Sequence, residues 1–131
     1  MAKRNLEMTI QRHLVQWCRK RGGVLEDIFS VPNEGARSVV MASLLKQAGL
    51  TPGWPDLGIP LDNGRVYWLE LKTKSGRLSE KQKAVHEKLR AKGHEVAVAY
   101  GFDAAKALLQ DLEYREQPHD TTTQTIPTGS D

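Results

Sequence analysis

Residues 55–72, PDLGIPLDNGRVYWLELK, contain the clearest structural signal in the sequence. At the centre of this stretch, Asp62-Asn63-Gly64 is a strong signal for a tight turn, because Asn and Gly accept the left-handed backbone that such turns need. Branched and aromatic residues beside the turn are typical of strands. We therefore expect a β-hairpin that joins a strand over 56–59 to a longer strand over 65–73.

The charged residues of this hairpin gather at one end of the expected sheet. Side chains alternate between the two faces of a strand, so Glu70 and Lys72 point the same way as Trp68. The turn also sets the pairing of the strands, and it brings Asp56 opposite the far end of the second strand. Two carboxylates and one ammonium group are therefore expected to converge on one point.

The rest of the chain supplies helices and strands around the hairpin. Apolar residues at helical spacing predict a helix over 6–21 that ends at Gly22. Ser79, with Gln82 three residues later, fits a capping box that opens a helix reaching Lys92. The same criteria predict a strand over 24–31, a helix over 37–47, a strand over 96–100 and a helix over 103–114 capped by Asp103. This order predicts an α/β fold, a mixed β-sheet flanked by helices.

The composition is that of an ordinary globular protein. The 131 residues are 39% hydrophobic and 27% charged, which fits one domain with one core. No stretch approaches the roughly 18–20 apolar residues of a membrane helix, and the first residues lack the apolar run of a signal peptide, so we expect a cytoplasmic protein without a membrane partner. Periodicity is lost after residue 114, which predicts a domain over 1–114 and a flexible tail over 115–131.

The convergence of Asp56, Glu70 and Lys72 has a chemical use. Magnesium is usually held by oxygen ligands from one or two carboxylates, with waters and a substrate phosphate completing its shell. A metal in that position polarises a phosphodiester and lowers the pKa of a bound water. The E-x-K triplet alone occurs by chance in most proteins and is then a surface pair. The combination of Pro-Asp, hairpin, apolar strand and E-x-K is far more restrictive.

Four separate blocks of the sequence resemble the VRR-NUC domain of the PD-(D/E)xK nuclease superfamily. They are Pro32-Asn33, residues 49–57, Glu70-Leu71-Lys72, and residues 76–79 followed by Gln82. The resemblance covers most of the chain before the tail and implies a restriction-endonuclease-like core. It also implies that Asp56 and Glu70 bind a divalent metal, Mg or Mn. The Leu71 carbonyl would be a further ligand, and Lys72 would be the catalytic lysine.

The resemblance gives a meaning to two more polar residues. Gln82 shares a helical stripe with Val85 and Leu89, so it faces the sheet near the end of the E-x-K strand. The family places a glutamine at the active site here, and Gln82 also completes a capping box. Glu7 lies at the edge of the apolar stripe of the first helix, where related nucleases carry a glutamate as an additional metal ligand or as a residue that holds a water. An acid near a helix N-terminus is also simply favourable to the helix dipole, so both interpretations of Glu7 stay open.

The net charge of +3 conceals one strongly basic segment. Residues 72–92 carry eight basic and two acidic side chains, a net +6, beginning at the expected catalytic lysine. Such a run is usually a solvated helix face, but beside a metal site it resembles the footprint of a phosphate-backbone binder. The expected DNA contacts are Lys74, Arg77 and Lys81, with Asn33 and Arg37 as further candidates that surface solvation explains equally well.

Other chemistries find little support in the sequence. The histidines His13, His86, His94 and His119 have no ligand spacing with one another or with Cys18, which argues against a zinc site. Cys18 is expected to be a buried thiol, and a single cysteine excludes an intramolecular disulfide. There is no glycine-rich phosphate loop ending in Lys-Ser/Thr, which argues against a nucleotide hydrolase.

The resulting hypothesis is a Mg- or Mn-dependent endodeoxyribonuclease that hydrolyses DNA phosphodiesters. Stand-alone members of the family resemble phage enzymes that pair as homodimers and cut branched DNA such as Holliday junctions, and such an enzyme would work in the host-cell cytoplasm. Cleavage of flap or single-stranded DNA is an alternative, and so is a non-catalytic DNA-binding module. Val39, Val40 and Met41 are candidates for a dimer face, although core packing explains them better.

Overall fold

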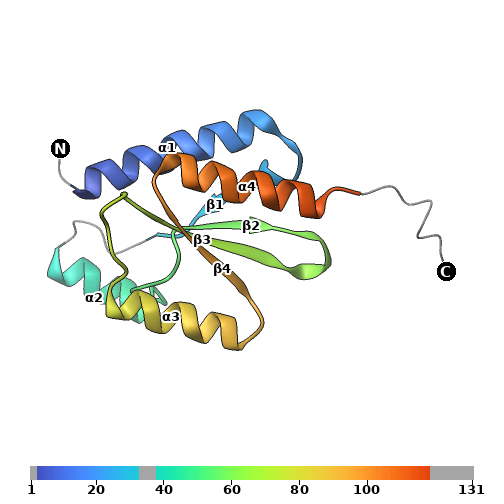
Figure 1. Ribbon diagram of the computed structural model, residues 1–131. Helices are drawn as coiled ribbons and strands as arrows, with labels where there is room; N and C mark the ends of the chain where they lie inside the picture. The colour runs from blue at the N-terminus through green and yellow to red at the C-terminus, as the bar shows by residue number, and fades with distance from the viewer. Residues whose placement is uncertain (1–2, 33–37, 119–131) are drawn as a thin grey trace.

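The computed structural model describes residues 3–32 and 38–118. Its elements, in chain order, are α1 (Lys3–Arg21), the 3-10 turn η1 (Gly23–Leu25), β1 (Phe29–Ser30), α2 (Val39–Gln47), β2 (Leu57–Pro60), the 3-10 turn η2 (Asp62–Gly64), β3 (Val66–Lys72), α3 (Glu80–Ala91), β4 (Glu95–Tyr100) and α4 (Phe102–Glu116). The strands form one sheet in the order β1-β2-β3-β4, antiparallel except for the parallel pair β3 and β4. Figure 1 shows α1 and α4 side by side on one face of this sheet and α3 on the other. The predicted α/β fold with a mixed, helix-flanked sheet is confirmed.

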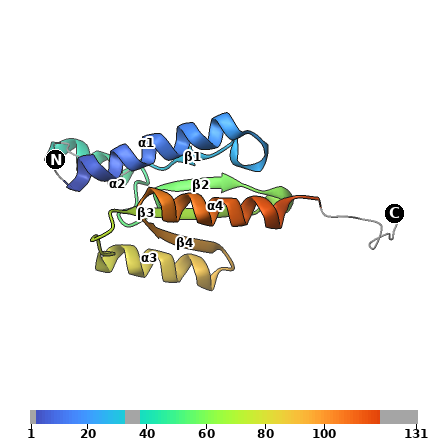
Figure 2. The same cartoon turned by 45° about the horizontal axis from the view of Figure 1, so that its top comes forward.

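The two faces of β3 have different environments. Tyr67, Leu69 and Leu71 are buried in the core on the side of α1 and α4. They share one core with side chains from those helices, namely Leu14, Cys18, Ala105, Leu109 and Leu112. Figure 2 shows these two helices and the sheet from a second angle. The other face of β3 carries Glu70, which contacts α3. The alternation of side chains along β3 therefore separates the apolar core from the charged residues.

The hairpin has the predicted turn and pairing. β2 pairs with β3 from Pro60↔Val66 at the turn to Leu57↔Leu69 at the far end. Asn63, in η2, has a φ of 65°, a left-handed conformation that Asn tolerates better than most residues. The turn therefore fixes which residues face one another where β2 ends.

The strand predicted over 24–31 is wrong for most of its length. The chain instead forms the 3-10 turn Gly23–Leu25, and only Phe29–Ser30 pairs with β2. The two glycines after α1 both have positive φ, which turns the chain sharply at that point. Leu25 and Ile28 are then both buried, at the spacing of a helical turn rather than of a strand. These apolar residues enter the core from a turn.

The start of α4 also differs from the prediction. The N-cap is Gly101, with a φ of 101°, and Asp103 lies in the first turn without capping the helix. The Gly101 N–H donates to the Lys72 carbonyl oxygen at 2.8 Å, and a Cβ on Gly101 would lie 3.3 Å from Cγ of Lys74. The turn from β4 into α4 is therefore tied to the end of β3, next to the charged residues.

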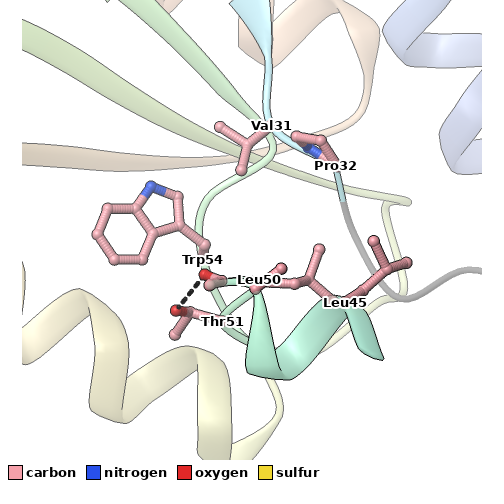
Figure 3. A pocket seen from close by; sticks show the side chains of 8 residues that line it. Val31, Pro32, Leu45, Leu50, Thr51 and Trp54 are labelled. Carbon is pink, nitrogen blue, oxygen red and sulfur yellow. Dashed lines mark hydrogen bonds between the residues drawn. The ribbon is translucent and has the colours of Figure 1, made fainter. Parts of the chain in front are cut away.

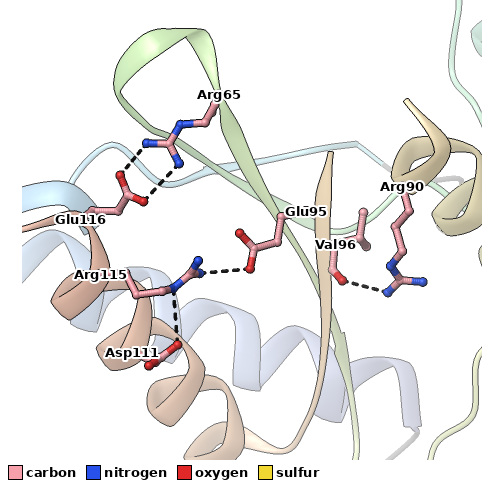
Figure 4. A network of polar contacts seen from close by, with 7 residues as sticks. All are labelled: Arg65, Arg90, Glu95, Val96, Asp111, Arg115 and Glu116. Atoms are coloured by element: carbon pink, nitrogen blue, oxygen red, sulfur yellow. Dashed lines mark hydrogen bonds and ion pairs between the residues drawn. The ribbon is translucent and has the colours of Figure 1, made fainter. Parts of the chain in front are cut away.

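Charged side chains hold the C-terminal end of α4 (Figure 4). Arg65, just after the hairpin turn, donates to both carboxylate oxygens of Glu116 at 3.1 and 2.7 Å, and Arg115 donates to Glu95 at 3.0 Å. α4 thus continues two residues past its predicted end, into the predicted tail. Residues 119–131 of that tail lie outside the described residues.

The predicted helices α1, α2 and α3 are confirmed, but α2 packs differently from the expectation. Val39 and Val40 are 86% and 70% exposed, and Met41 and Leu44 are exposed as well. Core packing therefore does not explain Val39, Val40 and Met41, because no element of the described chain covers this face of α2. Among the described residues, no helix has the length and apolar content needed to cross a bilayer.

Candidate active site

Asp56 lies directly before β2, where it meets the end of β3. Its Oδ2 accepts a hydrogen bond from the Leu71 backbone N–H at 2.8 Å. Since the last pair of the hairpin is Leu57↔Leu69, the preceding residue falls beside Glu70. The structure thus brings Asp56 and Glu70 together, as the hairpin register predicts.

A close contact between the loop before β2 and α3 fixes the position of Asp56. Gly53 in this loop has a φ of 93°, and a Cβ there would lie 2.6 Å from the Lys81 carbonyl oxygen. Only glycine lets the loop approach the first turn of α3 so closely. Pro55, which is buried, restricts the backbone just before Asp56. The start of β2 and the start of α3 are therefore held together at the site.

Glu70 is held from the α3 side. Its carboxylate is only 1% exposed, and Oε2 accepts a hydrogen bond from Gln82 Nε2 at 3.0 Å. Gln82 Oε1 in turn accepts from the Ser79 backbone N–H at 2.8 Å, and Ser79 Oγ accepts from the Gln82 N–H, so the capping box is complete. Gln82 therefore caps α3 and contacts Glu70 at the same time. On the other oxygen, His86 Nε2 lies 3.4 Å from Oε1.

Burial disfavours the ionised form of both carboxyl groups. Burial raises the pKa of Glu70 to about 9, with a further contribution from the negative charge of Asp56. Burial also raises the pKa of Asp56, although the Leu71 N–H lowers it in part. The positive charge of Lys72 lowers the pKa of both acids, which places its ammonium close to them. Lys72 is itself 8% exposed.

Glu7 on α1 belongs to the same electrostatic group. Its negative charge raises the pKa of both Asp56 and Glu70. One of its oxygens, Oε2, is buried and has no hydrogen-bond partner among the described residues. The first helix therefore brings a third carboxylate toward the end of β3.

The donor set suits a hard cation better than zinc. Within residues 3–32 and 38–118, no group of three or more His, Cys, Asp or Glu side chains forms a complete metal-binding set. Magnesium is commonly bound through one or two carboxylates, with waters and phosphate oxygens as its other ligands. The pair Asp56 and Glu70 meets that requirement.

The chain is similar to known proteins of one family. Residues 1–103 match the VRR-NUC domain family. The chain belongs to this family. A solved structure described as a VRR-NUC domain protein has a TM-score of 0.69 at 22% identity, with 90% of this chain and 95% of that chain covered. A second, described as a VRR-NUC domain, has a TM-score of 0.54 at 22% identity, with 79% and 94% covered. No curated protein matches the chain.

Membership of the VRR-NUC family implies a nuclease-type function and DNA binding. In this VRR-NUC domain, Lys74 and Arg77 line an open cavity of about 650 Å³ at the carboxyl ends of β3 and β4. Lys83 and Tyr100, which the sequence did not single out, line the same cavity. Lys81 is exposed on the first turn of α3 but does not line it. Asn33 and Arg37, the other expected DNA contacts, lie outside the described residues.

A second cavity of the VRR-NUC domain is apolar and lies between the end of α2 and the loop before β2 (Figure 3). Its volume is about 400 Å³, and Leu45, Leu50 and Trp54 point into it. Trp54 also packs edge-on against Trp68 of β3, with ring centroids 5.7 Å apart. The loop that carries Asp56 thus rests on aromatic contacts as well as on α3.

Cys18 and His86 are both buried, but only His86 lies at the candidate site. Burial raises the pKa of Cys18 to about 12, so this residue is the inert buried thiol that the sequence predicts. His86 belongs to no zinc site among the described residues, yet it lies against Glu70, a contact that the sequence pattern does not predict. The available signal was its spacing, because a residue four positions after Gln82 lies on the same face of a helix.

Proposed function

We propose that this VRR-NUC domain is a Mg- or Mn-dependent endodeoxyribonuclease. The proposal rests on one observation, the pair of carboxyl groups beside Lys72, of which Glu70 is buried and Asp56 is part-buried. Two acids withdrawn from water at one point are unfavourable in their ionised form unless a cation neutralises them. A bound divalent metal supplies that charge, polarises the scissile phosphodiester and activates the attacking water.

The residues that would hold the metal are Asp56, Glu70, the Leu71 carbonyl and Glu7. Glu70 Oε1 and Glu7 Oε2 fit this role, because both are buried oxygens without a hydrogen-bond partner among the described residues. The Leu71 N–H points to Asp56, and the N–H and C=O of one strand residue point to the same edge. Its carbonyl therefore lies on the Asp56 side of β3, beyond the end of β2.

On this proposal Lys72 is the catalytic lysine. Lys72 lies on the same face of β3 as Glu70, and the residue is only 8% exposed. From there it can neutralise negative charge that develops on the phosphate, or orient or deprotonate the attacking water. Gln82 contributes by holding the Glu70 carboxylate, and the cavity that Lys74 and Arg77 line would bind the DNA backbone next to the cut.

We further propose that the enzyme is of the stand-alone, phage type and acts on branched DNA such as a Holliday junction as a homodimer. A symmetric dimer places two sites for paired nicks. The exposed apolar face of α2, with Val39, Val40, Met41 and Leu44, is the surface that supports this assembly. Exposed apolar patches of this kind commonly mark protein interfaces.

A cleavage assay tests the proposal directly. Labelled four-way junction, flap, single-stranded and linear duplex DNA are incubated with the protein and Mg²⁺, Mn²⁺ or EDTA. We expect metal-dependent nicking with the junction preferred, and no cleavage in EDTA. Lys72→Ala should lower the cleavage rate by roughly 100-fold or more while retaining DNA binding in Ca²⁺. Lys92→Ala, an exposed lysine at the other end of α3, is the matched control and should cleave normally.

The alternatives give different results in the same experiment. Preferred cleavage of the flap or the single strand would replace the junction assignment. DNA binding without cleavage in either metal would show a non-catalytic binding module and end the nuclease proposal. A monomeric mass at micromolar concentration, with and without DNA, would end the proposal of paired nicks.

A further inference from the structure

The buried side chain of His86 has no part in the reaction as proposed so far. It is 1% exposed, and neither ring nitrogen has a hydrogen-bond partner among the described residues. A buried polar group without a partner costs roughly 1–3 kcal/mol. A leucine or phenylalanine would fill the same space on α3 without that penalty. Packing therefore does not account for a histidine here, and its neighbour Glu70 becomes the group to consider.

Gln82 and His86 approach Glu70 from successive turns of α3. Gln82 Nε2 donates to Oε2 at 3.0 Å, and His86 Nε2 lies 3.4 Å from Oε1. We call these two residues the α3 clamp. A shift of roughly half an ångström would bring His86 to the usual N–H···O distance. Each oxygen of the carboxylate thus faces one nitrogen of the clamp.

The clamp is anchored at one end and leaves the opposite side of Glu70 open. Gln82 is fixed by the capping box with Ser79, so its amide cannot turn without uncapping α3. A carboxylate oxygen has two lone pairs; Gln82 engages one on Oε2, and the His86 contact would engage one on Oε1 after the small shift described above. The other lone pairs remain for a cation shared with Asp56. Without His86, a carboxylate held through Oε2 alone is free to rotate about its last bond.

We propose that His86 is a positioning residue, which with Gln82 fixes the Glu70 carboxylate in the orientation that binds the divalent metal. This inference rests on the proposed function, since it assigns His86 a role in that same site. Partners that orient metal ligands typically contribute 10–100-fold to metal affinity. The expected signature is therefore a loss of metal affinity rather than of the chemical step.

The experiment measures Mn²⁺ binding by calorimetry without DNA, together with the Mn²⁺ dependence of cleavage. His86→Leu removes both nitrogens and should raise the Kd for Mn²⁺ about tenfold or more, with most of kcat recovered at saturating Mn²⁺. His86→Gln places an amide nitrogen near the Nε2 position and should restore the Kd to within about threefold of wild type. The control is Leu89→Ala, one turn further along α3, which removes buried side-chain volume but no polar group that could hold Glu70. It should lower the Tm and leave the Kd unchanged.

The possible results distinguish a failure of the positioning role of His86 from a failure of the proposed nuclease function. A wild-type Kd in His86→Leu, or an equal loss in Leu89→Ala, would overturn the positioning role while wild-type cleavage still supports the nuclease. A wild type that neither binds Mn²⁺ nor cuts DNA would overturn both. If His86→Leu does not fold, His86→Gln and His86→Asn decide the question, because the shorter Asn cannot reach Oε1. Equal Kd values for these two variants would then overturn the positioning role.

Discussion

In the metal-free protein, Glu70→Gln is expected to stabilise the fold, and increasingly so as the pH rises. Burial, followed by the negative charge of Asp56, raises the pKa of Glu70 from 4.5 to about 9 in the folded state. Between these pH values the folded protein keeps a proton that the unfolded chain has lost. The free energy of unfolding falls with pH wherever the folded state binds more protons. The Gln side chain does not titrate, so the free energy of unfolding of the variant does not fall with pH for this reason.

The size of the effect follows from the width of that pH window. Each pH unit within it lowers the stability of the wild type by at most about 1.4 kcal/mol. From pH 5 to pH 8 the upper bound is therefore about 4 kcal/mol. Asp56 shares the charge with Glu70 and titrates with it, so we expect roughly half of this, about 2 kcal/mol. The difference in Tm between variant and wild type should then widen by about 6–10 °C over this range.

Urea unfolding in EDTA, followed by circular dichroism at pH 5, 6.5 and 8, measures the effect. The matched control is Glu80→Gln on the first turn of α3, since the Glu80 side chain is 91% exposed. Its stability should follow the wild type at every pH. Adding Mn²⁺ at pH 8 should stabilise the wild type and leave Glu70→Gln almost unchanged, because the metal then binds only the protein with the intact carboxylate pair. A gap between Glu70→Gln and wild type that stays constant from pH 5 to pH 8 would refute the reasoning.

Three further predictions concern the surroundings of the site. In thermal unfolding, Gly53→Ala should destabilise the fold by more than about 2 kcal/mol, because the new Cβ would clash with the α3 backbone. Gly64→Ala is the control: its Cβ would meet open space, so only the positive φ should cost stability, about 1 kcal/mol. The double variant Lys74→Ala/Arg77→Ala should weaken DNA binding equally for all sequences and flatten its salt dependence by about two units of slope, and an unchanged slope would exclude the cavity as a phosphate site. Leu44→Asp should give a monomer in light scattering with an unchanged circular dichroism spectrum, and a persisting dimer would place the interface elsewhere.

The sequence predicts that Asp56, Glu70 and Gln82 lie together, and the structure shows them so, because the relevant signals are local. An Asn-Gly turn fixes the register of the hairpin, and the register alone places Asp56 beside Glu70. A capping box fixes where α3 begins, and with it the helical face that carries Gln82. Each of these signals lies within a few residues of the feature that it determines, so no knowledge of tertiary packing is needed.

The errors arise where one sequence pattern serves two kinds of packing. Leu25 and Ile28 were assigned to a strand from their composition, but two glycines turn the chain first and their spacing of three suits a turn. His86 was set aside because it has no ligand spacing with other histidines, whereas its partner is a carboxylate on another element. Which strand a helix faces is decided by tertiary packing, so this contact becomes predictable only after Gln82 is placed.

The apolar face of α2 and the carboxylate pair of the site are both features that a bound partner would stabilise. Val39 and Val40 expose apolar surface that burial against a partner would stabilise at roughly 25 cal/mol per Å². Asp56 and Glu70 hold acids withdrawn from water that a cation would stabilise. No element of the described chain covers this face of α2, and Lys72 supplies a single positive charge beside the two acids. Because any ligand that binds only the folded state adds to its stability, dimerisation and metal binding should each raise the Tm. A Tm that rises with Mn²⁺ and with protein concentration would show that a metal ion stabilises the carboxylate pair and that a second copy of the chain stabilises the folded protein.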